Sequence, residues 1–241
     1  MKKRLFVFLS VVVLYTGGCF RIENTDDIFS YRLPGVMLFT DMMDLALHTK
    51  AGSFLAPDLE NKIFSGEIGI GDLLYTIFTV NFSLPPTSSG LYSAYDIYHA
   101  VVNTASPSAT VDGASETDIY DFPIKDIAVL DFWNYYLYFA IDHQAPETQQ
   151  FDFEMTYDIN ETANIPTVYL RAGKIGEEIP STGSTAISTS FFAFNMTELT
   201  LKFMTPDNRL YINIKFRTGV DNDGNEVFTN FAFNPVFMVF D

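Results

Sequence analysis

The second half of this 241-residue chain alternates apolar and polar residues with a period of two, which constrains the fold more than any other feature. Residues 210–217 carry Leu, Ile, Ile and Phe at every second position, and residues 151–158 begin the same pattern with Phe, Phe, Met and Tyr. Successive side chains of a strand point to opposite faces of a sheet, so this alternation predicts strands with one buried face. Further candidates are residues 124–130, 134–141, 166–172, 189–196, 198–204 and 226–240. About eight short strands with almost no helical period predict an all-β fold that ends in an antiparallel β-sandwich.

The first half of the chain predicts a smaller β domain. Residues 36–40 and 73–82 have the composition of strands, whereas residues 95–102 fit either a strand or one face of a helix. Gly66, Gly69 and Gly71 punctuate a β-rich stretch, where glycine typically marks turns or bulges of a small barrel. Their spacing is not the dinucleotide-binding fingerprint, which also requires a strand-to-helix setting.

A stretch of small and polar residues divides the two halves. Residues 103–115 contain few large apolar side chains, which is typical of a long loop or linker. We therefore expect two domains, residues 31–120 and residues 121–241, with residues 19–30 as a tether before the first domain.

The N-terminus has the layout of a bacterial lipoprotein signal peptide. Basic residues at positions 2–4 precede an apolar run at 5–15, then Gly17, Gly18 and the single cysteine of the chain, Cys19. This order of basic, apolar and small residues marks export, so we expect residues 1–18 to be removed and Cys19 to be acylated. The alternative is an ordinary cleaved signal with an incidental cysteine. A transmembrane anchor is disfavoured because the apolar run is about half of the roughly 20 residues that cross a bilayer.

The chain is strongly acidic, with 14 Lys and Arg against 30 Asp and Glu, a formal net charge of −16. Removing residues 1–18 removes three basic residues and no acidic one, so the mature charge is 11 − 30 = −19. Nucleic acid is excluded as a partner, because binding a phosphate backbone depends on clustered Lys and Arg. Acidic character also disfavours adhesion to anionic lipid, so membrane attachment is expected to rest on the lipid anchor.

Sequence signatures of catalysis and of cofactor binding are absent. His48, His99 and His143 lie far apart in the chain, without a second ligand at metal-binding spacing. There is no Gly-x-Ser-x-Gly nucleophile elbow and no P-loop. We therefore expect neither a cofactor nor a metal, and no enzymatic activity. A hydrolase with two carboxylates remains an alternative, because such a pair leaves no trace in the sequence.

An acidic turn at residues 221–226 resembles a calcium loop only superficially. An EF-hand loop needs Gly at its sixth position and a bidentate acid at its twelfth, but Glu226 and Ala232 occupy these positions. Asp223-Gly224 between two apolar runs instead predicts a β-hairpin turn.

A candidate binding patch lies near residue 140. Alternation directs Leu137 and Phe139 inward and leaves Tyr136 and Tyr138 facing outward, where amphipathic rings serve recognition. Asp142 and His143, which we place in the loop just beyond, could join the patch. Ordinary β-propensity accounts for the tyrosines equally well.

Several of these strand patterns resemble the NigD-like lipoproteins. The segments that carry the resemblance are residues 126–139, 167–171, 190–194, 210–216 and 223–226, together with the lipoprotein signal. The resemblance implies an OB-like barrel followed by a β-sandwich, in a lipid-anchored protein of the outer membrane of a Gram-negative bacterium. The family takes its name from an operon linked to bacteriocin production. Its members have no established activity, so the resemblance implies none.

We therefore expect a cell-envelope lipoprotein that acts as a non-catalytic binding or structural module, with a glycan or a protein as partner besides the membrane. The alternatives are a carbohydrate-binding accessory protein, a bacteriocin-associated immunity or protection protein, and a hydrolase. A groove lined by Tyr136, Tyr138 and carboxylates would favour a sugar, whereas an exposed apolar patch would favour a protein. A deep pocket with two perturbed carboxylates would favour an enzyme.

Overall fold

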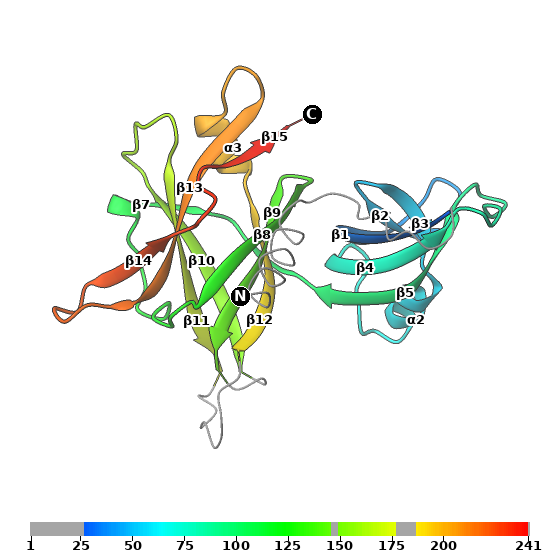
Figure 1. Cartoon of the computed structure of the whole chain (residues 1–241), viewed down its shortest axis with the longest axis horizontal. Helices are drawn as coiled ribbons and strands as arrows, with labels where there is room; N and C mark the ends of the chain where they lie inside the picture. The colour runs from blue at the N-terminus through cyan, green and yellow to red at the C-terminus, as the bar shows by residue number, and fades with distance from the viewer. Residues whose placement is uncertain (1–26, 146–148, 177–186, 241) are drawn as a thin grey trace, which may run out of the picture. The chain divides into compact units, whose positions relative to one another are not determined.

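The computed structural model of the chain describes residues 27–145, 149–176 and 187–240 and divides into two compact units, Met1–Asn103 and Thr104–Asp241 (Figure 1). Strands dominate both units, which confirms the all-β fold class. Cys19, the signal peptide and most of the tether lie outside the described residues. Within the described ranges, no helix has both the length and the apolar character needed to cross a membrane.

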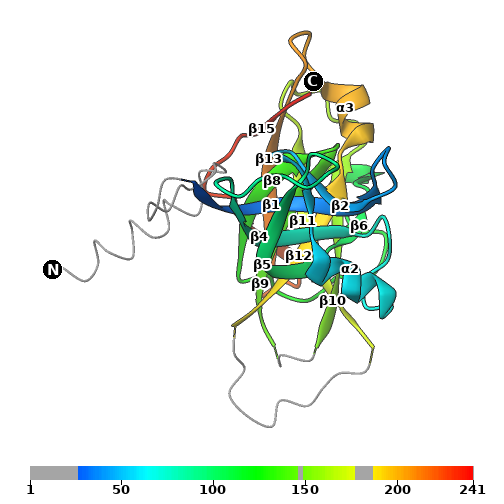
Figure 2. The same cartoon turned by 90° about the vertical axis from the view of Figure 1, so that its right-hand side faces the viewer.

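The first unit is a closed five-stranded barrel with the strand order β1-β2-β3-β5-β4. Its elements are β1 (Ile28–Phe39), β2 (Leu45–Thr49), β3 (Gly52–Leu55), α2 (Pro57–Phe64), β4 (Leu73–Asn81) and β5 (Tyr92–Val101). β3 runs parallel to β5, and the other neighbours are antiparallel. Figure 2 looks onto the barrel strands, with α2 beside them. A five-stranded barrel of this kind has the architecture of an OB fold, as the sequence resemblance implied.

Aromatic rings fill the centre of the barrel. The ring centroid of Phe78 lies 5.2 Å from those of Tyr31 and Phe54, so β1, β3 and β4 meet in one cluster. Leu59 of α2 is fully buried in the same core. The ambiguous segment 95–102 is mostly strand β5, because it pairs with β4 along its length.

The second unit is a β-sandwich of two sheets. One sheet has the order β6 (Asn103–Ala105), β12 (Ile187–Asn195), β9 (Tyr136–Gln144) and β8 (Asp126–Trp133). The other has the order β14 (Glu226–Asn230), β13 (Arg209–Val220), β11 (Thr167–Ile175), β10 (Gln150–Asp158) and β7 (Ser108–Thr110), with β15 (Val236–Val239) also paired to β13. Most neighbours are antiparallel, as expected, but β7 runs parallel to β10 and β11 runs parallel to β13.

The inward faces of the two sheets share an aromatic core. Phe153 of β10 contacts Phe192 of β12 edge to face, with ring centroids 5.2 Å apart. Phe194 packs in the same way against Phe139 of β9. Alternation in the sequence therefore identifies the core-facing residues of these strands correctly.

The division between the units falls earlier than the sequence indicated. Residues 103–115, which we interpreted as a linker, form β6, β7 and the short 3₁₀ helix η1 (Val111–Gly113). β7 pairs with β10, and the Tyr120 hydroxyl donates to Asp152 on the same strand at 3.1 Å. Small polar residues thus form edge strands of both sheets here, and residues 104–120 belong to the second unit.

The acidic turn at residues 221–225 joins β13 to β14 in a hairpin, which confirms the turn prediction. Asp221 Oδ1 accepts the backbone N–H groups of Asp223 and Asn225, both at 2.9 Å. These bonds lower the pKa of Asp221, and its carboxylate is engaged within the turn.

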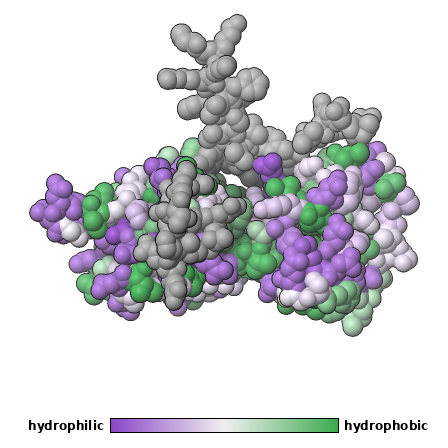
Figure 3. Space-filling model, turned by 90° about the horizontal axis from the view of Figure 1, so that it is seen from below, coloured by the Kyte–Doolittle hydropathy of each residue, from purple (hydrophilic) through white to green (hydrophobic). Residues whose placement is uncertain are grey.

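Figure 3 shows one face of the molecule coloured by hydropathy. Both hydrophilic and hydrophobic residues are exposed on this face of each unit.

Candidate functional site

Tyr138 does not face solvent as the alternation predicted. It lies on β9, between β8 and β12, and only 1% of its surface is exposed. Burial raises the pKa of its hydroxyl, which has no hydrogen-bond partner within the described residues. Tyr136 is half-buried, with its ring centroid 6.4 Å from that of Tyr138. Alternation placed Tyr138 on the face opposite Leu137, but both faces of the sheet are buried at this point, so Tyr138 cannot offer its ring to a ligand.

His143 is also a core residue rather than a loop residue. It belongs to β9, and its ring centroid lies 3.9 Å from that of Phe151 on the other sheet. Burial lowers the pKa of His143. Asp142 is half-buried and accepts a hydrogen bond from the Thr189 hydroxyl at 2.6 Å. The four predicted residues are therefore neighbours on β9, but two of them are inaccessible and they form no common binding surface.

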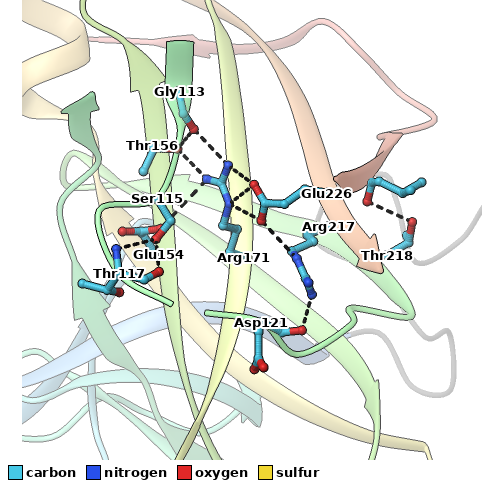
Figure 4. A network of polar contacts seen from close by, with 11 residues as sticks. Gly113, Ser115, Thr117, Asp121, Glu154, Thr156, Arg171, Arg217, Thr218 and Glu226 are labelled. Atoms are coloured by element: carbon cyan, nitrogen blue, oxygen red, sulfur yellow. Dashed lines mark hydrogen bonds and ion pairs between the residues drawn. The ribbon is translucent and has the colours of Figure 1, made fainter. Parts of the chain in front are cut away.

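A polar network holds residues 113–121 against the outer face of the β14-β13-β11-β10-β7 sheet (Figure 4). Arg171 of β11, 2% exposed, donates from Nε and Nη2 to the Glu226 carboxylate at 2.9 and 2.8 Å. It also donates from Nη1 to the Thr156 hydroxyl at 2.7 Å and from Nη2 to the Gly113 carbonyl at 3.0 Å. All three guanidinium nitrogens are thus engaged inside the protein.

Glu154 and Arg217 extend this network. Glu154 Oε2 lies 3.9 Å from Arg171 Nη1, too far for a hydrogen bond, and burial raises the pKa of Glu154. Arg217 Nε lies 3.0 Å from Glu226 Oε1 without the alignment of a hydrogen bond, and its Nη1 donates to the Asp121 carbonyl. The Arg171 guanidinium also lies 4.9 Å from the Phe228 ring centroid. These contacts fasten a chain segment to the outer face of the sheet.

Metal binding finds no support in the described parts of the chain. No group of three or more His, Cys, Asp or Glu side chains lies close enough there to hold an ion. His48 bonds to the Ser53 hydroxyl at 2.9 Å, and His99 lies 3.7 Å from Glu67 Oε1. The histidines therefore have separate local partners.

Residues 197–203 form helix α3 (Thr197–Phe203) and not the strand that we expected over 198–204. Met196, Leu199 and Thr200 are buried, and their spacing of three and four residues is that of one helical face. The Asn195 side chain accepts the Thr197 N–H at 3.0 Å, which turns the chain out of β12. Leu199 and Leu201 also fit a strand pattern, so the alternation was ambiguous in so short a segment.

An apolar groove of about 420 Å³ lies beside α3 and is the candidate binding site. Leu201 on its rim is 84% exposed, and the Phe240 ring lies at its edge, 4.8 Å from Phe132 and 5.4 Å from Tyr135. The lining residues are Tyr135, Thr197, Thr200, Leu201, Met204, Asn208 and Phe240. A second open groove across α3 shares Met204 with it. Sequence reasoning missed this site because the residues come from four separate segments.

Tyr135 is held in a special backbone conformation at the groove. Asn134 and Tyr135 have φ angles of 52° and 65°, so they form the two-residue turn between β8 and β9 with both residues in the left-handed region. A bulky residue rarely adopts this conformation. The Tyr135 carbonyl accepts the Met196 N–H at 2.8 Å, which ties the turn to the start of α3. The backbone that carries the Tyr135 side chain is therefore held in place at the groove.

Comparison with solved structures identifies the fold. A NigD-like immunity protein from Bacteroides caccae superposes with a TM-score of 0.53 at 14% identity, over 91% of this chain and 100% of that one. This chain has the fold of that NigD-like protein. An uncharacterised protein from Parabacteroides merdae gives 0.64 at 13% identity, over 87% of this chain and 98% of that one. A candidate lipoprotein from Bacteroides fragilis gives 0.51 at 10% identity, over 84% and 96%.

The resemblance to NigD-like lipoproteins that the strand patterns indicated is therefore confirmed in the fold. No protein-family model matches the sequence, and no curated protein matches it. At identities of 10–14%, the NigD-like fold carries no activity over to this chain.

Proposed function

We propose that this NigD-like chain is an outer-membrane lipoprotein, anchored through Cys19, whose second unit binds a protein partner without converting it. The groove beside α3 is the binding site. The lipoprotein-like signal supports the anchor, and so does the fold shared with a candidate lipoprotein.

The exposed apolar rim of the groove is the observation that carries this proposal. Isolated exposed apolar residues are common on protein surfaces, but here Leu201 and Met204 stand beside the rings of Tyr135 and Phe240. Aromatic anchors held in place before binding contribute most at protein interfaces, because little side-chain freedom is lost. The hydrogen bond from the Met196 N–H to the Tyr135 carbonyl holds the backbone of this anchor in place, and the Phe240 ring packs against the Tyr135 ring.

A protein fits this groove better than a glycan does. The sugar hypothesis required Tyr136 and Tyr138 with carboxylates around a groove, but Tyr138 is buried. The groove is lined by apolar side chains with threonine and asparagine, and no Asp or Glu belongs to it. The acidic chain also favours a basic partner, because complementary charge speeds encounter and disfavours acidic competitors.

The lining also supports binding without catalysis. Glu154, the carboxylate with a raised pKa, belongs to the Arg171 network rather than to the groove. The groove offers a tyrosine and two threonines but no acid, histidine or cysteine to act as a base. Immunity by binding a toxin polypeptide is the second candidate, and the fold shared with a NigD-like immunity protein favours it.

Site-specific photocrosslinking in intact cells tests the proposal. The photoreactive residue p-benzoylphenylalanine replaces Leu201, and the control places it at Met42, an apolar position in the first unit that is 69% exposed. We expect a discrete protein adduct from position 201 that is absent from position 42. Adding Tyr135→Ala should abolish the adduct, with the melting temperature showing that the fold is kept. Equal adducts from both positions, or an adduct indifferent to Tyr135→Ala, would contradict the groove as the binding site.

A further inference from the structure

β15 offers an open strand edge beside the groove. It pairs with β13 in antiparallel register, with Val239 opposite Arg209 and Phe237 opposite Tyr211. The Phe240 N–H donates to the Asn208 carbonyl at 3.0 Å, so Phe240, Met238 and Val236 direct their backbone groups toward β13. Backbone groups alternate along an antiparallel strand, and those of Phe237 and Val239 therefore point away from the sheet. Within the described residues, β13 is the only strand paired with β15.

β8, an edge strand of the other sheet, is protected against pairing with a further strand. The edge of β15 differs from it in this respect. On β8, the Asp126 carboxylate accepts the N–H of Ile127 and the Asp131 carboxylate accepts the N–H of Phe132, both at 2.8 Å. A bulge between Val129 and Asp131 further disrupts that edge. Bulges and charged residues are the usual means by which proteins prevent unwanted strand pairing.

β15 carries none of these protections within the described residues. Its outward residues are apolar and accessible, with Phe237 62% and Val239 50% exposed. An exposed edge with unpaired backbone groups is a template for a strand from another chain. The template ends at Phe240, whose ring also lines the groove beside α3.

Building on the proposed function, we propose that the partner binds as an extended strand added to β15, with its apolar side chains on alternate residues and basic residues between them. Main-chain hydrogen bonds to Phe237 and Val239 would supply the register, and the apolar side chains would lie on the same face as Phe237 and Val239. The peptide would reach the groove where it continues past Phe240. The occupant is a basic polypeptide rather than a second copy of this chain. Two copies, each with a mature charge of 11 − 30 = −19, would repel one another.

A peptide assay on the full-length lipoprotein in detergent tests the mode of binding. The probe is a fluorescein-labelled eight-residue peptide that alternates Lys and Val, followed by fluorescence anisotropy. Val239→Pro removes one outward N–H while leaving the bonds from Phe240 to β13, and Val239→Ala removes the side chain but keeps the N–H. We expect Val239→Pro to weaken binding about tenfold relative to Val239→Ala, because a strand hydrogen bond is lost. Leu201→Asn should also weaken binding, because it removes an apolar side chain from the groove without changing the charge.

Backbone-methylated peptides give a readout that does not depend on the folding of a variant. One peptide carries N-methyl groups on all valines and the other on all lysines, so each has one blocked edge. Strand addition requires one of them to bind like the parent peptide and the other to fail. If both bind, or if Val239→Pro binds as well as Val239→Ala, strand addition is wrong.

The outcomes separate the two proposals. Binding that is lost in Leu201→Asn but kept in Val239→Pro would overturn strand addition and retain the groove as a protein-binding site. Binding that neither variant affects would overturn both. Failure of the peptide to bind would overturn the basic alternating strand as the occupant. A dimer in sedimentation that Val239→Pro dissociates would identify a second copy as the occupant instead.

Discussion

The Asn234 side chain takes the place of a strand residue opposite Ile214. Its Oδ1 accepts the Ile214 N–H at 2.8 Å, and its Nδ2 donates to the Ile214 carbonyl at 2.8 Å. The same carbonyl accepts the Phe231 N–H at 2.9 Å. Asn234 thus bridges the gap between β14 and β15, so that both strands lie along one side of β13.

Replacing Asn234 should therefore loosen β15. Asn234→Ala leaves the N–H of the buried Ile214 without a partner, and we expect a loss of about 1–3 kcal/mol in the free energy of unfolding. Asn234→Asp keeps an acceptor for that N–H, and the Ile214 carbonyl retains Phe231, so the loss should be smaller. Urea unfolding of the two variants measures the difference. Equal losses would mean that Ile214 finds another acceptor.

The correct predictions from the sequence rest on simple geometric rules of strands and turns. Alternation along β10 and β13 identifies the core because the large apolar residues of each strand, such as Phe153 and Phe216, recur at every second position on the inward face. Glycine spacing indicated turns before β4, where Gly66 and Gly71 have positive φ angles. Each of these signals depends only on residues that are close together in the chain, so it can be recognised in a short stretch of sequence.

Tyr138, His143 and α3 were assigned incorrectly because their environments depend on distant segments. Tyr138 does point away from Leu137, but its own face of the sheet is buried as well. His143 continues β9 into the core, where Phe151 of another sheet meets it. The groove combines Tyr135, Leu201 and Phe240, which are joined only by tertiary contacts. No periodicity along one segment could reveal such a site.

Replacing Gly113 should destabilise the second unit strongly. Its φ angle is 69°, and an added Cβ would lie 2.5 Å from the Tyr169 ring. Gly113→Ala combines backbone strain with overpacking, so we expect a loss of about 2–4 kcal/mol in unfolding free energy. Gly224→Ala is the matched control, because its φ angle is 85° but nothing lies within 4 Å of the added Cβ. That variant should lose about 1 kcal/mol, and a similar loss in both would show that Tyr169 moves aside freely.

The second unit should fold alone if it begins at residue 104 and should be weakened if it begins at residue 121. The longer fragment keeps β7 and the Gly113 carbonyl that accepts from Thr156 and Arg171. The shorter fragment lacks β7 and the Gly113 carbonyl, and part of the outer sheet face becomes exposed. We expect cooperative urea unfolding of residues 104–241, with a lower midpoint for residues 121–241. Identical midpoints would mean that residues 104–120 add nothing to the stability of the sandwich.

Membrane attachment should depend on Cys19. Cys19→Ser removes the acylation site, and a protein of mature charge 11 − 30 = −19 has little electrostatic affinity for anionic lipid. We expect the variant to be recovered in the soluble fraction, as measured by fractionation and immunoblotting after a high-salt wash. Ser10→Ala, within the apolar run of the signal, serves as the control and should stay with the membrane. A Cys19→Ser protein that still sediments with membranes would contradict the lipoprotein interpretation.

His143 should make the second unit less stable in mild acid. Burial against Phe151 lowers its pKa, so the folded state binds fewer protons than the unfolded state, in which histidine titrates near about 6.5. The stabilising contribution is therefore complete above that pH and is lost as the pH falls below it. In the fragment 104–241, His143 is the sole histidine, so neither His48 nor His99 contributes.

The measurement compares the fragment with its His143→Leu variant between pH 8 and pH 5 by urea unfolding. The variant keeps an apolar group beside Phe151 but cannot take up a proton. Carboxylates such as Glu154 titrate in both proteins and cancel in the difference between them. We expect the stability of the wild-type fragment to fall relative to the variant as the pH drops below about 6.5. A difference that is independent of pH would show that His143 titrates in the folded sandwich as it does in the unfolded chain.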